Sequence, residues 1–376
     1  TDVDAACRIL SCLGCRCTRS GDTVCVDASN VCGNEIPDNL MREMRSSIVF
    51  LGAVLGRTRR CKLTFPGGCE LGARPIDLHL AALRDMGVTI SEEHGWLECT
   101  AAGGIRGGSV TLSFPSVGAT ENIMLAAVTA SGRTEIHNAA REPEIIDLAE
   151  FLVKCGAKIT GAGGSTICVE GVSRLSPAEH TVIPDRIVAG TYLCAAAMTR
   201  GELILTRCEP SHMTGFLPVL ESMGCRIYPY GGGKYVNCPR RLNAPPTIRT
   251  MPYPGFPTDI QALFTAVCSA AEGTAVFVET IFENRYRHIP ELIRLGASIK
   301  VEGRVAVVQG VEQLSGAKLC AGELRGGAAL VTAALAAEGT SEITGVGYID
   351  RGYESIEKAL RSVGADISRV GQQSRN

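Results

Sequence analysis

Two observations predict an α/β fold organised as two similar domains: the length of the chain and a repeat that recurs six times along it. At 376 residues the chain is longer than one hydrophobic core usually fills, so two domains are the expected arrangement. Apolar residues make up 45% of the sequence and charged residues 20%, an ordinary balance for a globular protein. Each repeat combines helical and strand patterns, which is typical of the α/β class.

The first repeated pattern is the apolar end of a helix, followed by a glycine and then a strand. In one copy, Ile145, Leu148 and Leu152 lie on one helical face just before the glycine. Separations between successive glycines are 73, 69, 68, 72 and 68 residues, which indicates repeated supersecondary units. Each glycine is expected to supply the left-handed residue that ends its helix. The six glycines are Gly14, Gly87, Gly156, Gly224, Gly296 and Gly364.

A second series of glycines interleaves with the first, in stretches such as TASGRTEI and AAEGTSEI. Each lies 23 to 31 residues before a glycine of the first series, so a unit is expected to hold two helices and several short strands. The members are Gly56, Gly132, Gly201, Gly273 and Gly339. A sixth member would fall upstream of Thr1, and the repeat therefore predicts an N-terminal truncation.

Six units divide naturally into two domains of three. The expected domains are residues 1–183, lacking a first helix and strand, and residues 184–369, followed by a polar tail over residues 370–376. At the junction, Pro184 and Asp185 in IPDRIVAGTY predict a crossover and then a helix start.

The composition argues against several classes of function. A net charge of −2 and 5% aromatic residues disfavour nucleic-acid binding, and no apolar run approaches the roughly 20 residues that span a bilayer. No signal peptide is visible, and the 17 scattered cysteines are interpreted mostly as small buried hydrophobes in a reducing cytoplasm. Cys12, Cys15 and Cys17 form a C-x-x-C-x-C pattern, but no second ligand cluster accompanies it, so no metal is expected.

The stretch FPGGCELGARPIDLH presents a cysteine on two glycines just before a helix start. Paired glycines are common turn formers, so a plain turn is the favoured interpretation from spacing alone. The alternative is an exposed thiol at Cys69 close to positive charge, which is the setting of reactive cysteines. Arg74 and Pro75 at a helix start suit an anion, and Asp77 can cap the helix or accept a ligand hydroxyl.

Other loops also place polar residues before predicted helices. In FPSVGAT, Ser116 is either an N-cap or, with Gly118, part of a backbone cradle for phosphate. The proline-rich MPYPGFPTDIQ delivers Asp259 at a helix start, where the local sequence suits a capping role and a functional role equally well. Three arginines are, taken alone, more often solvated surface charges: Arg45, Arg285 and Arg351.

The chain closely resembles the UDP-N-acetylglucosamine 1-carboxyvinyltransferase family in six motifs: PGGCELGARPIDLH, FPSVGATENIM, NAAREPEI, PYPGFPTDIQA, FENRYRHIPEL and IDRGYE. The resemblance runs from Thr1 to about Arg369. It implies two domains, each of three βαβαββ units forming an inverse α/β barrel, with the first unit incomplete here. It also implies transfer of the enolpyruvyl group of phosphoenolpyruvate to the 3'-hydroxyl of UDP-N-acetylglucosamine, which opens peptidoglycan synthesis and needs no cofactor.

The resemblance also implies roles for individual residues. Cys69 is implied to be the general acid, able to carry a covalent phosphoenolpyruvate adduct and to be alkylated by fosfomycin, on a loop whose glycines let it close as a lid. Asp259 is implied to be the base for the sugar hydroxyl, while Arg45, Arg74 and Arg351 hold phosphoenolpyruvate or its charged products. The full set implied to bind the substrates comprises Arg45, Arg74, Pro75, Ile76, Asp77, Leu78, Ser116, Val117, Gly118, Asp259, Ile281, Arg285 and Glu323.

Departures from the family pattern keep alternatives open. The family's N-terminal Lys-Asn pair would fall upstream of Thr1, and Glu323 stands where the family usually has aspartate. A longer side chain at a charge-lined site is expected to shift positioning, so a non-catalytic protein that binds the nucleotide-sugar is one alternative. The sister enzyme 5-enolpyruvylshikimate-3-phosphate synthase is another, and the loop cysteine and ARPIDLH argue against it.

Overall fold

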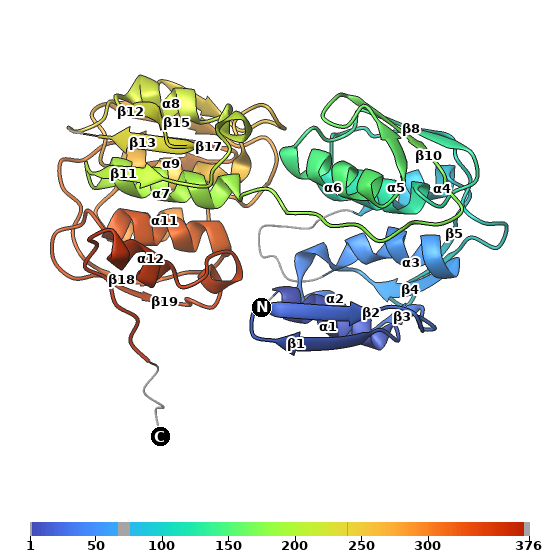
Figure 1. The fold of residues 1–376 in the computed structure, drawn as a ribbon. Helices are drawn as coiled ribbons and strands as arrows, with labels where there is room; N and C mark the ends of the chain where they lie inside the picture. The colour runs from blue at the N-terminus through green and yellow to red at the C-terminus, as the bar shows by residue number, and fades with distance from the viewer. Residues whose placement is uncertain (1, 67–75, 239, 372–376) are drawn as a thin grey trace. The chain divides into compact units, whose positions relative to one another are not determined.

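The computed structural model describes residues 2–66, 76–238 and 240–371. The chain separates into two compact units, which we call the N-terminal unit, up to Ile183, and the C-terminal unit, from Pro184 onward. Figure 1 labels the helices and strands of each unit, and each is described by itself below.

The N-terminal unit alternates helices with short strands along its whole length. Its elements are α1 (Asp2–Cys12), β1 (Arg16–Ser20), β2 (Thr23–Asp27), β3 (Glu35–Ile36), α2 (Asp38–Glu43), the 3₁₀ turn η1 (Arg45–Val49), α3 (Phe50–Thr58), β4 (Arg60–Thr64), α4 (Asp77–Asp85), β5 (Thr89–Glu93), β6 (Trp96–Thr100), β7 (Ser109–Thr111), α5 (Val117–Ala127), β8 (Arg133–His137), α6 (Pro143–Lys154), β9 (Lys158–Thr160) and β10 (Thr166–Glu170).

The C-terminal unit repeats this alternation. Its elements are α7 (Arg186–Met198), β11 (Glu202–Leu205), η2 (Pro210–Met213), α8 (Leu217–Met223), β12 (Arg226–Tyr230), β13 (Gly233–Asn237), β14 (Thr247–Arg249), α9 (Thr258–Ser269), β15 (Thr274–Val278), α10 (Ile289–Arg294), β16 (Ser298–Glu302), β17 (Val305–Gln309), β18 (Lys318–Cys320), α11 (Leu324–Ala334), β19 (Glu342–Thr344), η3 (Ile349–Arg351) and α12 (Ile356–Ser362).

Three four-stranded sheets in the described residues share one topology, with strand orders β3-β4-β6-β5, β7-β8-β10-β9 and β14-β15-β17-β16. In each sheet the first two strands run parallel and the other pairs run antiparallel. A parallel pair needs a crossover helix, whereas the last two strands of each unit need only a hairpin turn. The result is the predicted βαβαββ unit.

The remaining sheets of the described chain hold fewer strands: β1-β2, β11-β13-β12 and β18-β19. The repeat pattern also predicted a strand after Gly364, and this prediction is wrong for residues 365–371, which form no strand. The segment is instead held by a side chain, because the Arg361 guanidinium donates to the Ile367 carbonyl over 2.8 Å. A backbone carbonyl bonded in this way needs no ladder partner.

All six glycines of the first series have a left-handed backbone, with φ between 84° at Gly87 and 113° at Gly224. The predicted helix caps are therefore confirmed, since glycine alone adopts this conformation without a steric penalty. At Gly224, for example, the backbone N–H donates to the Glu221 carbonyl at the end of α8.

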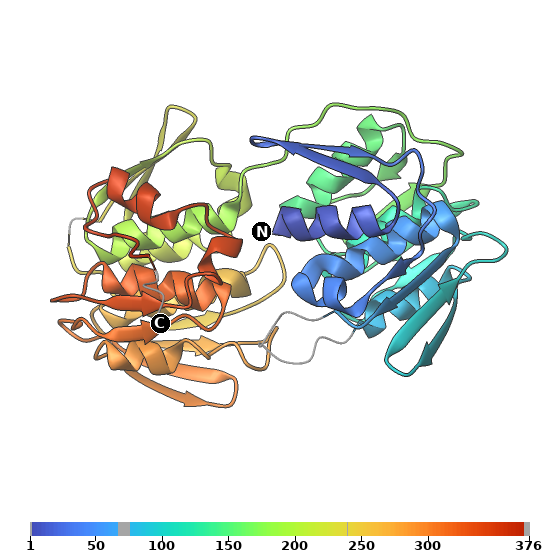
Figure 2. The same cartoon turned by 90° about the horizontal axis from the view of Figure 1, so that it is seen from below.

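Helices rather than sheets form the centre of the C-terminal unit. Helices α7, α9 and α11 pack against one another, and every residue from Ile260 to Ser269 of α9 is buried. In Figure 2, a view from below, sheets lie around the outside of this unit. The arrangement agrees with the inverse order that the resemblance implied, with separate sheets around central helices. In the N-terminal unit, α3 and α5 pack together in the same way.

Most described cysteines are core residues, as predicted. Nine of the sixteen are buried: Cys15, Cys61, Cys99, Cys155, Cys194, Cys208, Cys225, Cys238 and Cys268. Within the described part of the chain, no three His, Cys, Asp or Glu side chains gather as metal ligands would. The helices found there are all too short or too polar to cross a membrane.

Candidate active site

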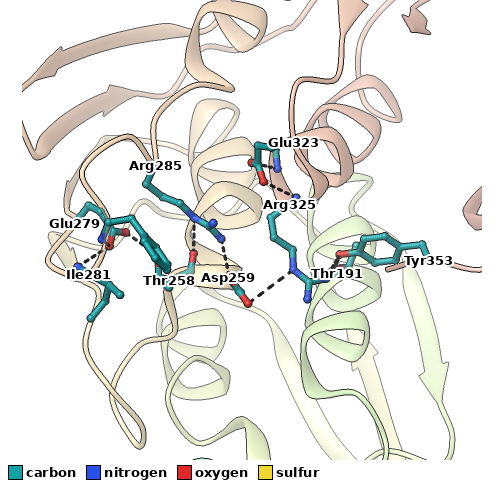
Figure 3. Close-up of polar contacts among 11 residues, drawn as sticks. Thr191, Thr258, Asp259, Glu279, Ile281, Arg285, Glu323, Arg325 and Tyr353 are labelled. Carbon is teal, nitrogen blue, oxygen red and sulfur yellow. Dashed lines mark hydrogen bonds and ion pairs between the residues drawn. The ribbon is translucent and has the colours of Figure 1, made fainter. Parts of the chain in front are cut away.

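Asp259 lies at the start of α9, where two arginines approach its carboxylate (Figure 3). Nη2 of Arg285 donates to Oδ1 over 2.8 Å, and Nε of Arg325 lies 4.0 Å from Oδ2. Pro257 occupies the N-cap position, so Asp259 is not the residue that caps the helix. Its side chain keeps 45% of its surface exposed, which leaves the carboxylate accessible. Two guanidinium groups around one carboxylate leave a net positive charge that suits an anionic ligand.

Arg285 is buried behind Asp259 rather than solvated. Its side chain is only 2% exposed, which shows that the interpretation as a surface charge was wrong for this residue. Nε donates to the Thr258 carbonyl over 3.1 Å, and the guanidinium lies 5.6 Å from the ring centre of Phe282. A buried guanidinium needs such partners because an unpaired charge in the interior is costly. Arg285 thereby fixes the position of the Asp259 carboxylate.

Glu279 organises the loop that carries Ile281, and sequence analysis missed it. The side chain follows β15 and is 1% exposed. Its Oε1 accepts hydrogen bonds from the backbone N–H groups of Ile281, at 2.8 Å, and Phe282, at 3.0 Å. Its Oε2 accepts from the Thr258 hydroxyl over 3.0 Å. The only sequence signal is an acidic residue directly after an apolar strand, in TAVFVE.

Arg325 is a second residue that sequence analysis missed. It lies in the first turn of α11, where the Glu323 carboxylate accepts from the backbone N–H groups of Arg325, at 2.9 Å, and Gly326. Glu323 is therefore the N-cap of α11, and its longer side chain is used for this cap. Burial alone would lower the pKa of Arg325, but the nearby Asp259 carboxylate, helped by the hydrogen bond to Tyr353, outweighs burial and raises the pKa. The guanidinium stays charged.

Other predicted residues lie in different surroundings. Arg351 ends η3 and is half-buried, and Arg45 is the first residue of η1. Three of the predicted residues lie outside the described residues: Cys69, Arg74 and Pro75.

A groove of about 630 Å³ in the N-terminal unit brings several predicted binding residues together. Ile76, Asp77 and Leu78, at the start of α4, line one side of the groove, and the segment 111–113 lines another. Ser116 caps α5, since its Oγ accepts from the Ala119 backbone N–H over 3.3 Å. Helix starts leave backbone N–H groups for other acceptors, and Val117 and Gly118 occupy the first helical positions here.

A buried network connects α4 with α5 beside this helix start. Nδ2 of Asn122 donates to the Ile48 carbonyl over 2.9 Å and lies 2.9 Å from Nδ1 of His79, while Oδ1 accepts from Gly52. Burial lowers the pKa of His79 to about 4, so the imidazole is neutral near pH 7. Since an amide N–H faces Nδ1, the ring proton lies on Nε2. A Cβ on Gly118 would come within 3.2 Å of this ring.

Comparisons with known proteins show which class of protein this chain belongs to. Residues 1–360 match the family model described as EPSP synthase (3-phosphoshikimate 1-carboxyvinyltransferase), so the chain is a carboxyvinyltransferase-family protein. The structure is also similar to that of the enolpyruvyl transferase NikO from Streptomyces tendae, with a TM-score of 0.86 at 25% identity, covering 98% of this chain and 88% of the other. EPSP synthase from Acinetobacter baumannii shares the fold, with a TM-score of 0.70 at 17% identity over 97% and 88% of the two chains.

Sequence relatives narrow the class. A UDP-N-acetylglucosamine 1-carboxyvinyltransferase 2 from Caldanaerobacter subterraneus subsp. tengcongensis is 54% identical over 369 residues, covering 98% of this chain and 88% of the relative. A UDP-N-acetylglucosamine 1-carboxyvinyltransferase from Zymomonas mobilis subsp. mobilis is 46% identical over 378 residues, with the same coverage. The chain belongs to the UDP-N-acetylglucosamine 1-carboxyvinyltransferase family.

Proposed function

We propose that this protein transfers the enolpyruvyl group of phosphoenolpyruvate to the 3'-hydroxyl of UDP-N-acetylglucosamine and releases phosphate. The observation that carries the proposal is 54% identity over 369 residues to a relative bearing that name. The exposed Asp259 carboxylate between two charged guanidinium groups supports it, because the reaction needs a base beside an anion-binding site.

The reaction proposed is an addition followed by an elimination. The sugar oxygen adds to C2 of phosphoenolpyruvate, its proton passes to the Asp259 carboxylate, and C3 receives a proton from the Cys69 thiol. The resulting tetrahedral ketal then loses phosphate from C2 and returns a proton from C3 to the Cys69 thiolate, which restores the double bond. The departing phosphate takes the proton from Asp259, so both side chains regain their starting states. The balance is one enolpyruvyl ether and one phosphate for each pair of substrates, so no oxidant, reductant or organic cofactor is consumed.

Most of the remaining predicted residues are proposed to bind one or the other of the two substrates. Arg45, Arg74 and Arg351 are proposed to hold the phosphate and carboxylate of phosphoenolpyruvate, because bidentate guanidinium pairing suits both groups. The nucleotide-sugar is proposed to contact residues 74–78, residues 116–118 and Ile281. The groove lined by residues 76–78 supports this assignment of the α4 start.

Two members of the predicted set have a different proposed role. The Arg285 and Glu323 side chains are buried and bonded to neighbours, so they are proposed to position Asp259 and the start of α11 rather than to contact substrate. In the cell, the protein is proposed to act in the cytoplasm in the first committed step of peptidoglycan synthesis, and hence in cell-wall growth and division. Its Cys69 thiol is proposed to be the target of fosfomycin.

The test is phosphate release from phosphoenolpyruvate, with and without UDP-N-acetylglucosamine. We expect release that requires the nucleotide-sugar and that falls by about 100-fold or more in Asp259→Asn, the usual loss on removing an acid–base group. Cys69→Ala should lose release similarly, while the exposed thiol variant Cys320→Ala and the exposed carboxylate variant Asp366→Asn serve as matched controls. Release that ignores the nucleotide-sugar, or persists in Asp259→Asn, would contradict the proposal.

A further inference from the structure

The hydroxyl of Tyr353 joins three segments of the C-terminal unit that are far apart in sequence. It lies 2.8 Å from Oγ1 of Thr191 on α7 and 3.2 Å from Nη1 of Arg325 on α11 (Figure 3). Tyr353 itself follows η3 by two residues and is only 3% exposed. A buried tyrosine with two polar partners is tightly fixed, because leaving either partner unpaired is costly.

Each hydrogen bond in this chain of contacts has only one possible donor. A guanidinium has only donors, so Nη1 of Arg325 donates and the Tyr353 oxygen accepts. The Thr191 hydroxyl donates to the Ile187 carbonyl over 2.8 Å, which uses its single proton. The Tyr353 hydroxyl must therefore donate to Oγ1 of Thr191. Every link is satisfied from Arg325 to the backbone of α7, and such networks reinforce each bond.

These hydrogen bonds orient the Arg325 guanidinium. Tyr353 holds Nη1 through its hydroxyl, and the guanidinium carbon lies 5.7 Å from the centre of the tyrosine ring. On its other side, Nε faces Asp259 at 4.0 Å. No acceptor within the described residues takes a hydrogen bond from the remaining nitrogen, Nη2. Two fixed contacts thus leave one charged N–H₂ group facing the surroundings of the Asp259 carboxylate.

We propose that Tyr353 is a positioning residue for enolpyruvyl transfer: it orients Arg325 so that Nη2 binds an anionic group of phosphoenolpyruvate beside Asp259. This inference rests on the proposed function. Tyr353 does not touch the substrate and acts only through Arg325. Its place two residues after Arg351 means that the same hydroxyl also ties the segment carrying that arginine to α7 and α11.

The experiment measures KM and kcat for both substrates in Tyr353→Phe, which keeps the ring and removes only the hydroxyl. We expect KM for phosphoenolpyruvate to rise about tenfold, the size of one lost hydrogen bond to a charged group, with KM for UDP-N-acetylglucosamine unchanged. Thr191→Val should give a smaller rise, and Thr191→Ser, which keeps the hydroxyl, should restore normal values. Tyr228→Phe, at an exposed tyrosine of β12, is the matched control.

A double-mutant cycle separates positioning from mere stability. In an Arg325→Lys background, Tyr353→Phe should add almost nothing, because the group through which it acts has gone. Additive effects, or equal losses for both substrates that follow the melting temperature, would overturn the proposal. Binding of phosphoenolpyruvate alone, measured by calorimetry without UDP-N-acetylglucosamine, gives a readout without turnover. If wild type neither binds nor turns over, the proposed function itself fails; if wild type works and Tyr353→Phe equals it, only the positioning role fails.

Discussion

Glu279 offers a quantitative test of how the site is held together. Its buried carboxylate accepts two backbone hydrogen bonds from the Ile281 loop and one from the Thr258 hydroxyl at the start of α9. Glu279→Ala removes all three hydrogen bonds at once. Glu279→Gln keeps one oxygen for the two backbone N–H groups and presents an amide to the Thr258 hydroxyl, which can accept a hydrogen bond.

The two substitutions differ in expected magnitude. In the alanine variant, the Ile281 and Phe282 N–H groups lose their acceptor, which costs about 1–3 kcal/mol each, or about 4 kcal/mol in all. That is a large fraction of a typical total stability of about 5–15 kcal/mol. The glutamine variant loses only the charge on the acceptor, which costs about 1 kcal/mol. For a unit of this size, about 2–4 °C per kcal/mol gives falls in melting temperature of about 12 °C and about 3 °C.

Thermal unfolding monitored by circular dichroism measures both variants against wild type. We expect the melting temperature to be highest for wild type, lower for the glutamine variant and lowest for the alanine variant. The alanine variant should also have a raised KM for the nucleotide-sugar, because the Ile281 loop is released. An alanine variant that melts within 2 °C of wild type, or a glutamine variant as damaged as alanine, would refute the account of Glu279 as the acceptor that orders this loop.

Three further predictions concern the N-terminal unit. Gly52→Ala should destabilise by about 3 kcal/mol in denaturant unfolding, because its Cβ would fall 2.2 Å from the Asn122 carbonyl oxygen, whereas Gly103→Ala meets no atom nearer than 3.5 Å and should be neutral. Burial lowers the pKa of His79 from 6.5 to about 4, so the neutral imidazole contributes fully to the free energy of unfolding above pH 6.5. As the pH falls toward 4, up to about 3 kcal/mol of that free energy is lost. A His79→Asn variant with the same pH dependence of stability as wild type would contradict this. Burial, then the charges of Glu144 and Glu142, raise the pKa of Glu121 to about 7. Glu121→Gln should therefore stabilise the folded state by about 2 kcal/mol at pH 8 and hardly at pH 4. Equal stabilisation at both pH values would count against this prediction.

The repeat could be predicted from the sequence because the residues that end each helix act locally. A helix that ends before a strand needs a left-handed residue, and glycine is the residue that supplies it cheaply. The six caps therefore followed from spacing, and so did the placement of Asp259 after Pro257 at a helix start. The absence of a strand over residues 365–371 was not readable, because a strand exists only where another segment pairs with it.

The surroundings of Asp259 depend on contacts between distant segments, and local patterns do not encode them. Arg285, 26 residues away, looks like a surface charge in ENRYRH and becomes buried only because the Asp259 carboxylate and the Thr258 carbonyl receive it. Arg325 reaches Asp259 from another helix altogether, 66 positions along the chain. The capping role of Glu323 follows from its own helix start, whereas the family resemblance implied a substrate role for it.

The most direct test of the central claim follows the enolpyruvyl carbon itself. The protein is incubated with phosphoenolpyruvate labelled in its carbon skeleton and with UDP-N-acetylglucosamine, and the products are separated by anion exchange and identified by mass spectrometry. The account predicts that label moves into the nucleotide-sugar as a 3'-enolpyruvyl ether, with one phosphate released per ether formed, and that Asp259→Asn abolishes both. Label that stays in phosphoenolpyruvate, or that moves into shikimate 3-phosphate when this alcohol is supplied in place of UDP-N-acetylglucosamine, would contradict it.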